Sequence, residues 1–96
     1  MFKFIKVTGN SLYPEYQEGD YVMTITFPFF RFKRGDIVIF NHPKYGRMIK
    51  DINWIESDKI HVIGKHPGSI DSRQFGPIHR KDITGKVIWH IRRVKE

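Results

Sequence analysis

Apolar and polar residues alternate along several short runs of this chain, as they do in strands, where side chains repeat every second residue. The run 20–26 (Asp-Tyr-Val-Met-Thr-Ile-Thr) is the clearest example, whereas 36–41 is nearly all apolar and indicates a buried strand. Strands are predicted over residues 2–7, 20–26, 36–41, 47–55, 59–64 and 85–94. No stretch has the 3.6-residue period of an amphipathic helix. We therefore predict a mainly β fold, a small coiled or barrel-like antiparallel sheet.

The segments between these runs contain turn residues. Pro14 limits 11–16 to a turn or a single helical turn. Residues 42–46 (His-Pro-Lys-Tyr-Gly) and 56–58 (Glu-Ser-Asp) are typical of turns, and 66–76 is predicted to be irregular. Because there is no linker, internal repeat or low-complexity segment, residues 1–96 are expected to form a single domain.

Composition narrows the class of protein. The chain has no cysteine, which excludes disulfides and thiolate metal ligands. No apolar run approaches the roughly 18 residues of a transmembrane helix, and the alternating N-terminal segment 1–6 does not resemble a secretory signal. We therefore expect a protein without a membrane span or signal peptide, either cytoplasmic or peripheral at a membrane.

The balance of 17 basic and 10 acidic residues gives a formal net charge of +7, which permits an anionic partner. Nucleic acid is not favoured as that partner, because the sequence has no helix-turn-helix, zinc finger or RNA-binding aromatic motif. Between residues 27 and 34, basic side chains are interleaved with Phe27, Phe29, Phe30 and Phe32. These rings either pack beneath the sheet or form an aromatic-basic lip that contacts lipid headgroups at a membrane surface.

A serine near the end of the first predicted strand is the first candidate for chemistry. Gly9 permits a tight backbone path, Ser11 follows two residues later, and Pro14 fixes the exit of the chain. Ser11 is either an ordinary turn residue or a nucleophile, and a nucleophilic serine needs a base to take its proton.

Lys50 is the candidate for that base. In the strand 47–55, Met48, Lys50, Ile52 and Trp54 share one face, so the lysine lies in an apolar row. Desolvation would lower the pKa of its amine below about 10.4 and leave more of it neutral and able to accept a proton. Alternatively, Lys50 lies at a strand edge and its amine reaches water along the apolar stem.

The histidines do not offer a better site. None of the five forms a His-Glu-x-x-His or similar ligand pattern, and they are His42, His61, His66, His79 and His90. No metal and no other cofactor is expected. A Ser-His-Asp triad that uses Ser11 stays open, but it explains nothing that a Ser/Lys pair does not.

With Ser11 and Lys50 in view, the sequence resembles the type I signal peptidase family of Ser/Lys serine proteases. Four blocks in order, covering most of the chain, support the resemblance: Gly9-Asn10-Ser11-Leu12-Tyr13-Pro14 with Gly19-Asp20, Gly35-Asp36 with a hydrophobic strand, Met48-Ile49-Lys50, and Ser69-Ile70-Asp71-Ser72-Arg73 with Gly76. Within that family, the chain resembles in particular the small soluble relatives that mature nickel-type superoxide dismutase, because they share a His-Pro pair, here His42-Pro43.

The chain departs from the pattern of this family at several positions. Leu12 replaces the usual methionine, and Asp51 stands where an arginine is common. Gly9 occupies a position where many relatives have a serine or threonine that helps to form the oxyanion hole. By resemblance, that hole would rely on the backbone N–H of Ser11 and a second donor that the sequence does not identify.

The resemblance also implies supporting roles. Ser69 would hydrogen-bond and orient the Lys50 amine, and Asp71 and Arg73 would form an ion pair that braces their loop. Gly9 and Asn10 belong to the block around the nucleophile. Leu12 is the candidate wall of a shallow apolar substrate pocket.

The function that follows is that of a serine endopeptidase with a Ser/Lys dyad. It would remove an N-terminal signal or leader peptide from a precursor through an acyl-enzyme, and the precursor protein or peptide would lie along a strand edge. One alternative is a Ser/Lys domain like those of self-cleaving regulators, although only ten residues precede Ser11 here. The other alternative is a non-catalytic peptide-binding module of the same fold.

Overall fold

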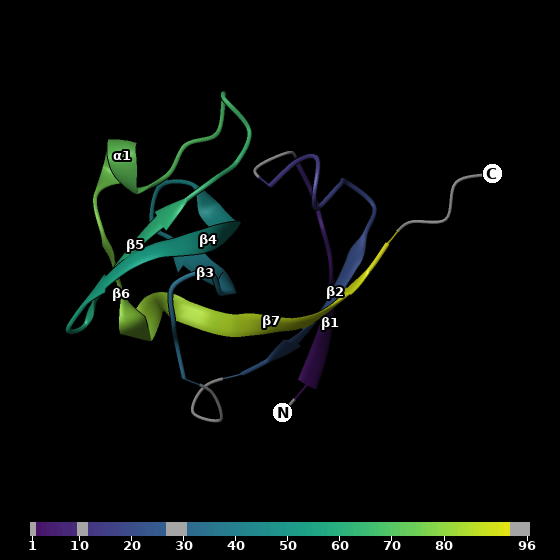
Figure 1. Ribbon diagram of the computed structural model, residues 1–96, viewed down its shortest axis with the longest axis horizontal. Coiled ribbons are helices and arrows are strands. Elements are labelled where there is room, and N and C mark those ends of the chain that lie inside the picture. Colours follow the sequence, from purple (N-terminus) through teal and green to yellow (C-terminus); the bar gives the residue numbers. More distant parts are fainter. Residues whose placement is uncertain (1, 10–11, 27–30, 93–96) are drawn as a thin grey trace.

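The computed structural model describes residues 2–9, 12–26 and 31–92. They form one antiparallel sheet of seven strands in the order β1-β2-β7-β3-β4-β5-β6 (Figure 1). The strands are β1 (Phe2–Lys6), β2 (Tyr21–Ile25), β3 (Ile37–His42), β4 (Gly46–Glu56), β5 (Lys59–Ile63), β6 (Ile78–His79) and β7 (Ile83–Ile91). A one-turn helix α1 (Ser72–Phe75) precedes β6, and a 3-10 turn η1 (Arg80–Asp82) follows it. The prediction of a mainly β fold is confirmed.

Each predicted strand corresponds to one observed strand, with ends that differ by a few residues. Three short elements, β6, α1 and η1, were not predicted. β6 has two residues, too few for alternation to be visible. α1 has only four residues, too few to show the helical period in the sequence, and it is held by contacts that such a pattern would not reveal.

β3 is the central element of the packing, because it is buried on both faces. Val38 and Phe40 face one hydrophobic cluster, and Ile37 and Ile39 face another. Cluster 1 contains the buried residues Val38, Phe40, Ile52, Ile60, Val62, Ile78 and Ile83. Cluster 2 contains Val7, Leu12, Tyr16, Val22, Ile37 and Ile39. The continuous apolar run in β3 therefore serves two cores, one on each side of the sheet.

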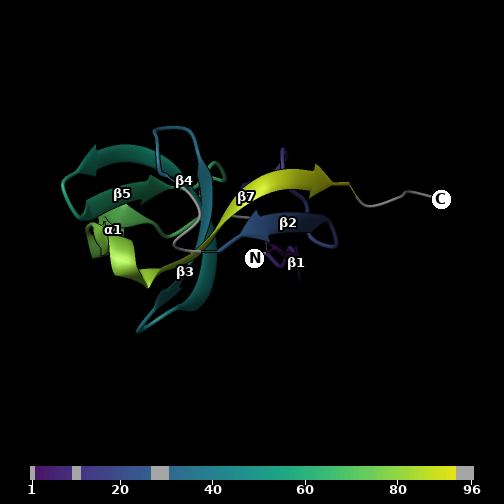
Figure 2. The same cartoon turned by 90° about the horizontal axis from the view of Figure 1, so that it is seen from below.

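The sheet is coiled, and different elements make up its two ends. In Figures 1 and 2, β1, β2 and the C-terminal half of β7 form one end, while β4, β5 and α1 form the other. β7, drawn in yellow, runs across the molecule and joins them. On its two edges it pairs with β2 and with β3.

A bulge in β4 corrects one part of the predicted pattern. Met48, Lys50 and Ile52 do lie in one row, opposite Phe40 and Val38 of β3 and Val62 of β5. The register shifts between Ile52 and Trp54, however, so the alternation is interrupted at Asn53. Trp54 does not join the buried row, and 57% of it is exposed.

The phenylalanine-rich segment is described only in part. Phe27, Phe29 and Phe30 lie outside the described residues, so the structure leaves the predicted membrane contact untested. Phe32 is half-buried, packs against cluster 1, and lies beneath the guanidinium of Arg80 at 4.8 Å from the ring centre. This contact agrees with the first alternative, in which the rings pack under the sheet. In the described part of the chain, no helix has the length and apolar character needed to cross a membrane.

Candidate active site

The segment that follows β1 is fixed by the backbone at both of its ends. The N–H of Val7 donates to the carbonyl of Asp20 at 2.7 Å, and the N–H of Gly19 donates to the carbonyl of Val7 at 3.0 Å. Gly9 has a φ of +79°, which favours glycine there. Asn10 and Ser11, the predicted nucleophile, lie outside the described residues. Leu12 comes next in the chain, and its burial in cluster 2 holds the chain just after Ser11 against the sheet.

A carboxylate and an imidazole join the end of this segment to β7. Asp20 Oδ2 lies 2.7 Å from His90 Nε2 and also accepts the backbone N–H of Gln17 at 3.0 Å. The ring of Tyr16 stacks on that of His90 with centres 4.1 Å apart. The sequence did not predict this contact, because 70 residues separate Asp20 from His90 and neither shows a local motif for the pair. The only signal was the Gly19-Asp20 step of the nucleophile block.

Lys50 lies in the interior of the sheet and is completely buried. It projects from β4 opposite Val38, between Met48 and Ile52. β4 is paired with β3 on one side and β5 on the other, so the alternative of an edge lysine that reaches water is wrong. Burial lowers the pKa of the Lys50 amine, against the negative charge of Asp71, which raises it, and with a smaller lowering by Arg73.

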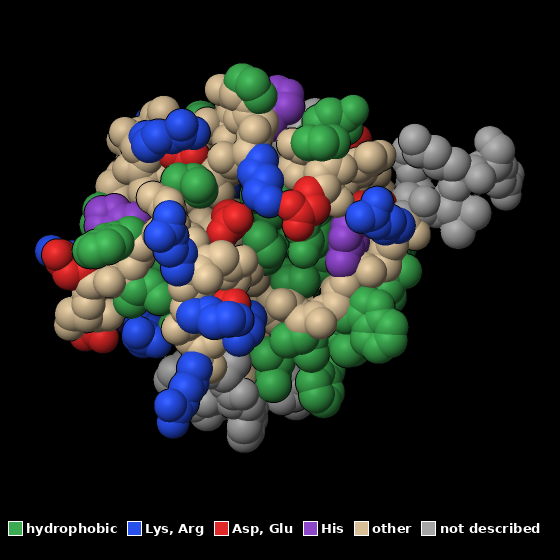
Figure 3. All heavy atoms as spheres, viewed as in Figure 1, with side chains coloured by type: hydrophobic (Ala, Val, Ile, Leu, Met, Phe, Trp, Pro, Cys, Tyr) green, Lys and Arg blue, Asp and Glu red, His purple; other side chains and the backbone are tan. Residues whose placement is uncertain are grey.

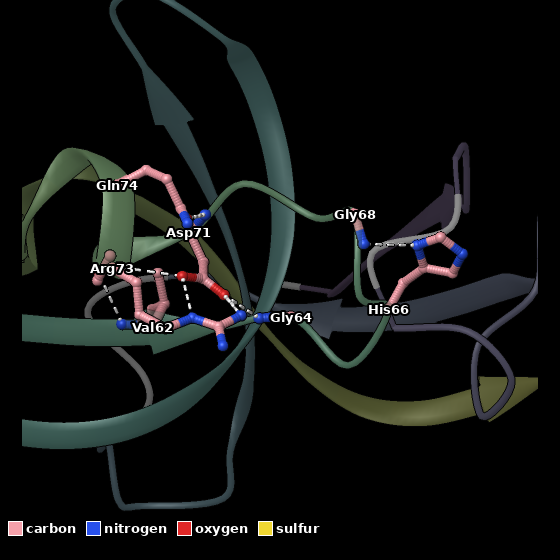
Figure 4. Close-up of polar contacts among 8 residues, drawn as sticks. Val62, Gly64, His66, Gly68, Asp71, Arg73 and Gln74 are labelled. Atoms are coloured by element: carbon pink, nitrogen blue, oxygen red, sulfur yellow. Dashed lines mark hydrogen bonds and ion pairs between the residues drawn. The ribbon is translucent and has the colours of Figure 1, made fainter.

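Asp71 and Arg73 form the ion pair that the resemblance implied. Arg73 Nη2 lies 2.8 Å from Asp71 Oδ2, and Arg73 Nε donates to Asp71 Oδ1 at 3.0 Å, as Figure 4 shows. Asp71 is completely buried, while 62% of the Arg73 side chain is exposed. Burial alone would raise the pKa of Asp71, but hydrogen bonds from the Arg73 side chain and from the backbone of Gly64 and Arg73 lower it to about 2.

The same residues attach α1 to β5. Asp71 caps the helix, since its carboxylate accepts the N–H of Arg73 while its own N–H donates to the Gln74 side chain. Asp71 Oδ2 also accepts the N–H of Gly64 at 2.9 Å, and Ser72 Oγ accepts the N–H of Val62 at 2.8 Å. These bonds satisfy one N–H of β5 and one just after it, both past the two residues of β5 that pair with β6. Asp71 therefore stays ionised close to Lys50 and keeps a fixed position.

Ser69 corrects another expectation. Its backbone N–H donates to the carbonyl of His66 at 3.0 Å, which holds it in a turn. Its Oγ is buried and has no hydrogen-bond partner among the residues that the structure describes. The predicted hydrogen bond from Ser69 to the Lys50 amine is therefore not formed here. A buried hydroxyl without a partner is costly, which makes Ser69 Oγ available to a bound molecule.

A cavity of about 360 Å³ opens beside Lys50. Its walls come from β1 and the residues after it, from β2, β3 and β4, and from the loop before Asp71. The lining residues are Ile5, Lys6, Val7, Thr8, Val22, Ile39, Tyr45, Arg47, Met48, Ile49, Lys50, Gly68 and Ile70. Leu12 was predicted to form the wall, but it packs behind it, in cluster 2 with Val7, Val22 and Ile39. The sequence did not identify these other wall residues, which belong to separate strands.

One edge of the sheet borders this cavity. β1 pairs with β2 alone among the described strands, so its other edge is open to a further strand. Ile5 and Val7 of this region line the cavity that also contains Lys50. An extended peptide that pairs with β1 would place its backbone beside the lysine.

Contacts between side chains join the segment after β1 to the segment after β5. Lys65 forms an ion pair with Glu15 and lies 3.9 Å from Asp51, and the rings of Tyr13 and His66 meet edge to face. Asp51, where the family commonly has arginine, therefore takes part in joining the two loops. Within the described residues, His, Asp and Glu do not gather in a group of three that could hold a metal ion.

Comparison with known proteins identifies the family. A search of curated proteins finds no match for this sequence. A family model described as Peptidase S24-like matches residues 2–88, nearly the whole chain and every site residue named above except His90. This match supports the predicted resemblance to signal-peptidase-type Ser/Lys proteases. It does not separate the maturation proteases of nickel-type superoxide dismutase from other members, so that closer likeness stays a prediction. The chain belongs to the Peptidase S24-like family.

Proposed function

We propose that this protein is a serine endopeptidase that removes an N-terminal leader segment from a precursor. The observation that carries the proposal is Lys50, a completely buried lysine whose pKa is lowered and whose side chain lines a cavity beside an open strand edge. Burial of a lysine side chain is costly for its charged form, because the ammonium group loses its contact with water, and it therefore favours the neutral amine. A neutral amine in this place is suited to accept a proton.

In the proposed mechanism, the precursor lies extended against the open edge of β1. Neutral Lys50 takes the proton of the Ser11 hydroxyl while Ser11 Oγ attacks the scissile carbonyl. The protonated amine then gives its proton to the leaving nitrogen as the peptide bond breaks, which leaves an ester between Ser11 and the acyl part. Lys50 next takes a proton from water while the hydroxide attacks the ester, and as the ester bond breaks the protonated Lys50 amine gives that proton to Ser11 Oγ, which releases the acid product.

Asp71 and Arg73 would act as positioning residues. Asp71 alone would draw Lys50 toward its charged form, and Arg73 opposes that effect. Their bidentate pair keeps the loop before α1 against β5 and close to the base. Ser69 Oγ, buried and without a described partner, would donate to the substrate or to a water molecule.

The pocket suits small or modest apolar side chains near the cut. Val7, Val22, Ile39, Ile49 and Ile70 form an aliphatic part of its lining, while Lys6 and Arg47 contribute a polar part. The aliphatic walls would bind aliphatic side chains and help to keep the Lys50 amine desolvated.

The test is the digestion of a mixed peptide library, read by mass spectrometry, with wild type, Ser11→Ala and Lys50→Ala in parallel. Cuts after small residues that appear with wild type alone would support the proposal. Full activity of the Lys50→Ala protein would contradict the mechanism. Binding of peptides by wild type without any cleavage would favour a non-catalytic peptide-binding module.

A further inference from the structure

The cavity beside Lys50 is one half of a longer groove. A second hollow of about 300 Å³ adjoins it, and the two share the lining residues Ile5 and Arg47. The second hollow is lined by Lys3, Ile5, Thr24, Thr26, Asn41, Arg47, Thr84 and Gly85. The groove thus continues along β1, away from Lys50 and toward the start of the strand.

The two halves differ in chemistry, and the pairing of the strands explains why. Lys3, Ile5 and Val7 are alternate residues of one row, opposite Thr24 and Val22 of β2 on the same face. On β4, Arg47 is followed by Ile49 in the corresponding row, opposite Asn41 and Ile39 of β3. Along both strands the inner face changes from aliphatic near Lys50 to polar and cationic at the far end.

The charge of the groove has one sign. Its lining contains Lys3, Lys6 and Arg47 in addition to Lys50, and no aspartate or glutamate is among the described lining residues. Lys3 and Arg47 are both exposed, and neither has an ion pair among the contacts of the described residues. An anionic side chain in the far half would meet two cations and no competing carboxylate.

We propose that the far half of the groove selects precursors with an acidic side chain a short distance from the scissile bond. The proposal rests on the peptidase function proposed above. Arg47 is three residues from Lys50, and Lys3 is four residues from Val7. At about 3.3 Å per residue, these spacings place the acidic residue about three to five residues from the cut in an extended peptide.

The test uses one cleavable peptide with Glu, Gln or Lys placed singly at each of the six positions on either side of the cut. Wild type should cleave the Glu peptide about three- to fivefold faster than the Lys peptide, in kcat/KM at low salt, at one position in this range. Arg47→Glu should invert that order at the same position. High salt should reduce both preferences, because the groove is open to solvent.

Arg34→Glu is the matched control, since Arg34 is exposed, lies outside the lining of the groove and undergoes the same change of charge. Thermal unfolding should show that both variants are folded. Equal rates for Glu and Lys peptides at every position would overturn the proposal. An equal inversion by Arg34→Glu would also overturn it, because the effect would then come from net charge.

A wild-type protein that cleaves none of these peptides would contradict the peptidase function and leave the groove to be tested by binding. Fluorescence anisotropy would then compare labelled Glu and Lys peptides on the Ser11→Ala protein. Tighter binding of the Glu peptide, lost with Arg47→Glu, would support the acidic preference by itself. Equal binding of the two peptides would overturn it.

Discussion

Lys50 and Asp71 are both completely buried, and the protein treats their charges in opposite ways. At Asp71, burial acts to raise the pKa, but the hydrogen bonds from Arg73 and Gly64 outweigh it and bring the value to about 2. At Lys50, burial is the largest effect and lowers the pKa of the amine. One group is fixed in its charged form at neutral pH, and the other is moved toward its neutral form.

The difference shows that burial alone does not decide the charge of a group. Donors that point at a buried carboxylate stabilise its charged form, whereas an apolar row such as Met48 and Ile52 around an amine stabilises its neutral form. The two sites also interact, because Asp71 raises the pKa of Lys50 and Arg73 lowers it. Arg73 therefore serves both sites, by charging Asp71 and by limiting the effect of that charge on the lysine.

Lys50→Met gives the largest expected effect. Loss of the base should reduce kcat/KM for peptide cleavage by about 10³-fold or more. The free energy of unfolding should increase, because methionine fits an apolar row. The pKa of Lys50 in the folded protein lies below its ordinary value of 10.5, which applies to the unfolded chain. Between these two pKa values the unfolded chain binds more protons than the folded protein, so wild type loses stability as the pH falls through that range.

Urea unfolding at several pH values would measure this effect. The stability of Lys50→Met relative to wild type should increase as the pH falls, and Met23→Leu, a half-buried apolar exchange away from Lys50, should show no such trend. A Lys50→Met protein that is destabilised equally at every pH would contradict the argument that the buried amine is desolvated.

Asp71→Asn should have the next largest effect. Lowering the pKa from 3.8 to about 2 corresponds to about 2–2.5 kcal/mol of stability that is present above the unfolded pKa and is lost as the pH falls through 3.8 toward 2. Asparagine keeps the shape but not the charge, so urea unfolding at pH 7 should show most of this loss. Below about pH 2 the two proteins should converge.

Asp58→Asn is the control for that experiment. Asp58 forms an exposed ion pair with Arg80 at 3.8 Å, and 68% of its side chain is exposed. Exposed pairs contribute little, so its removal should change the stability by less than about 1 kcal/mol. Equal losses for Asp58→Asn and Asp71→Asn would show that the burial of Asp71 has no special consequence.

Arg73→Gln should have the smallest effect and should act on the lysine through Asp71. Removing the guanidinium leaves the carboxylate to raise the pKa of Lys50, so the rise of kcat/KM with pH should move to higher pH. Arg73→Lys should restore part of the original profile. A pH profile identical to that of wild type would show that the ion pair only braces the loop. Arg34→Gln serves as the control for the change in net charge.

Alternation along single strands was enough to predict most of the sheet and the placement of Lys50. Lys50 was identified because Met48 and Ile52 flank it in the same row, and the apolar run 36–41 indicated a buried strand. Trp54 was misplaced because a bulge leaves no mark in the apolar pattern. β6 was missed because two residues pair there only after α1 has brought them to β5.

The candidate site was less accessible to sequence reasoning where it depends on distant partners. The pairing of Asp71 and Arg73 was implied by the family resemblance, but the bonds from Gly64 and Val62 depend on how α1 meets β5. Leu12 was assigned to the pocket because it follows Ser11 in the sequence, whereas its burial results from the packing of cluster 2. Asp20 and His90 could not be joined at all without the position of β7.

The place of β7 in the sheet also determines when the molecule can be completed during synthesis. β7 comes after all the other strands in the sequence, yet it lies between β2 and β3. While a ribosome is still making residues 83–91, β2 and β3 have no partner to connect them, and cluster 2 lacks the strand that joins its two sides. Pairings between such distant segments form slowly. The cavity beside Lys50 therefore cannot take its final shape on a growing chain until this strand has emerged.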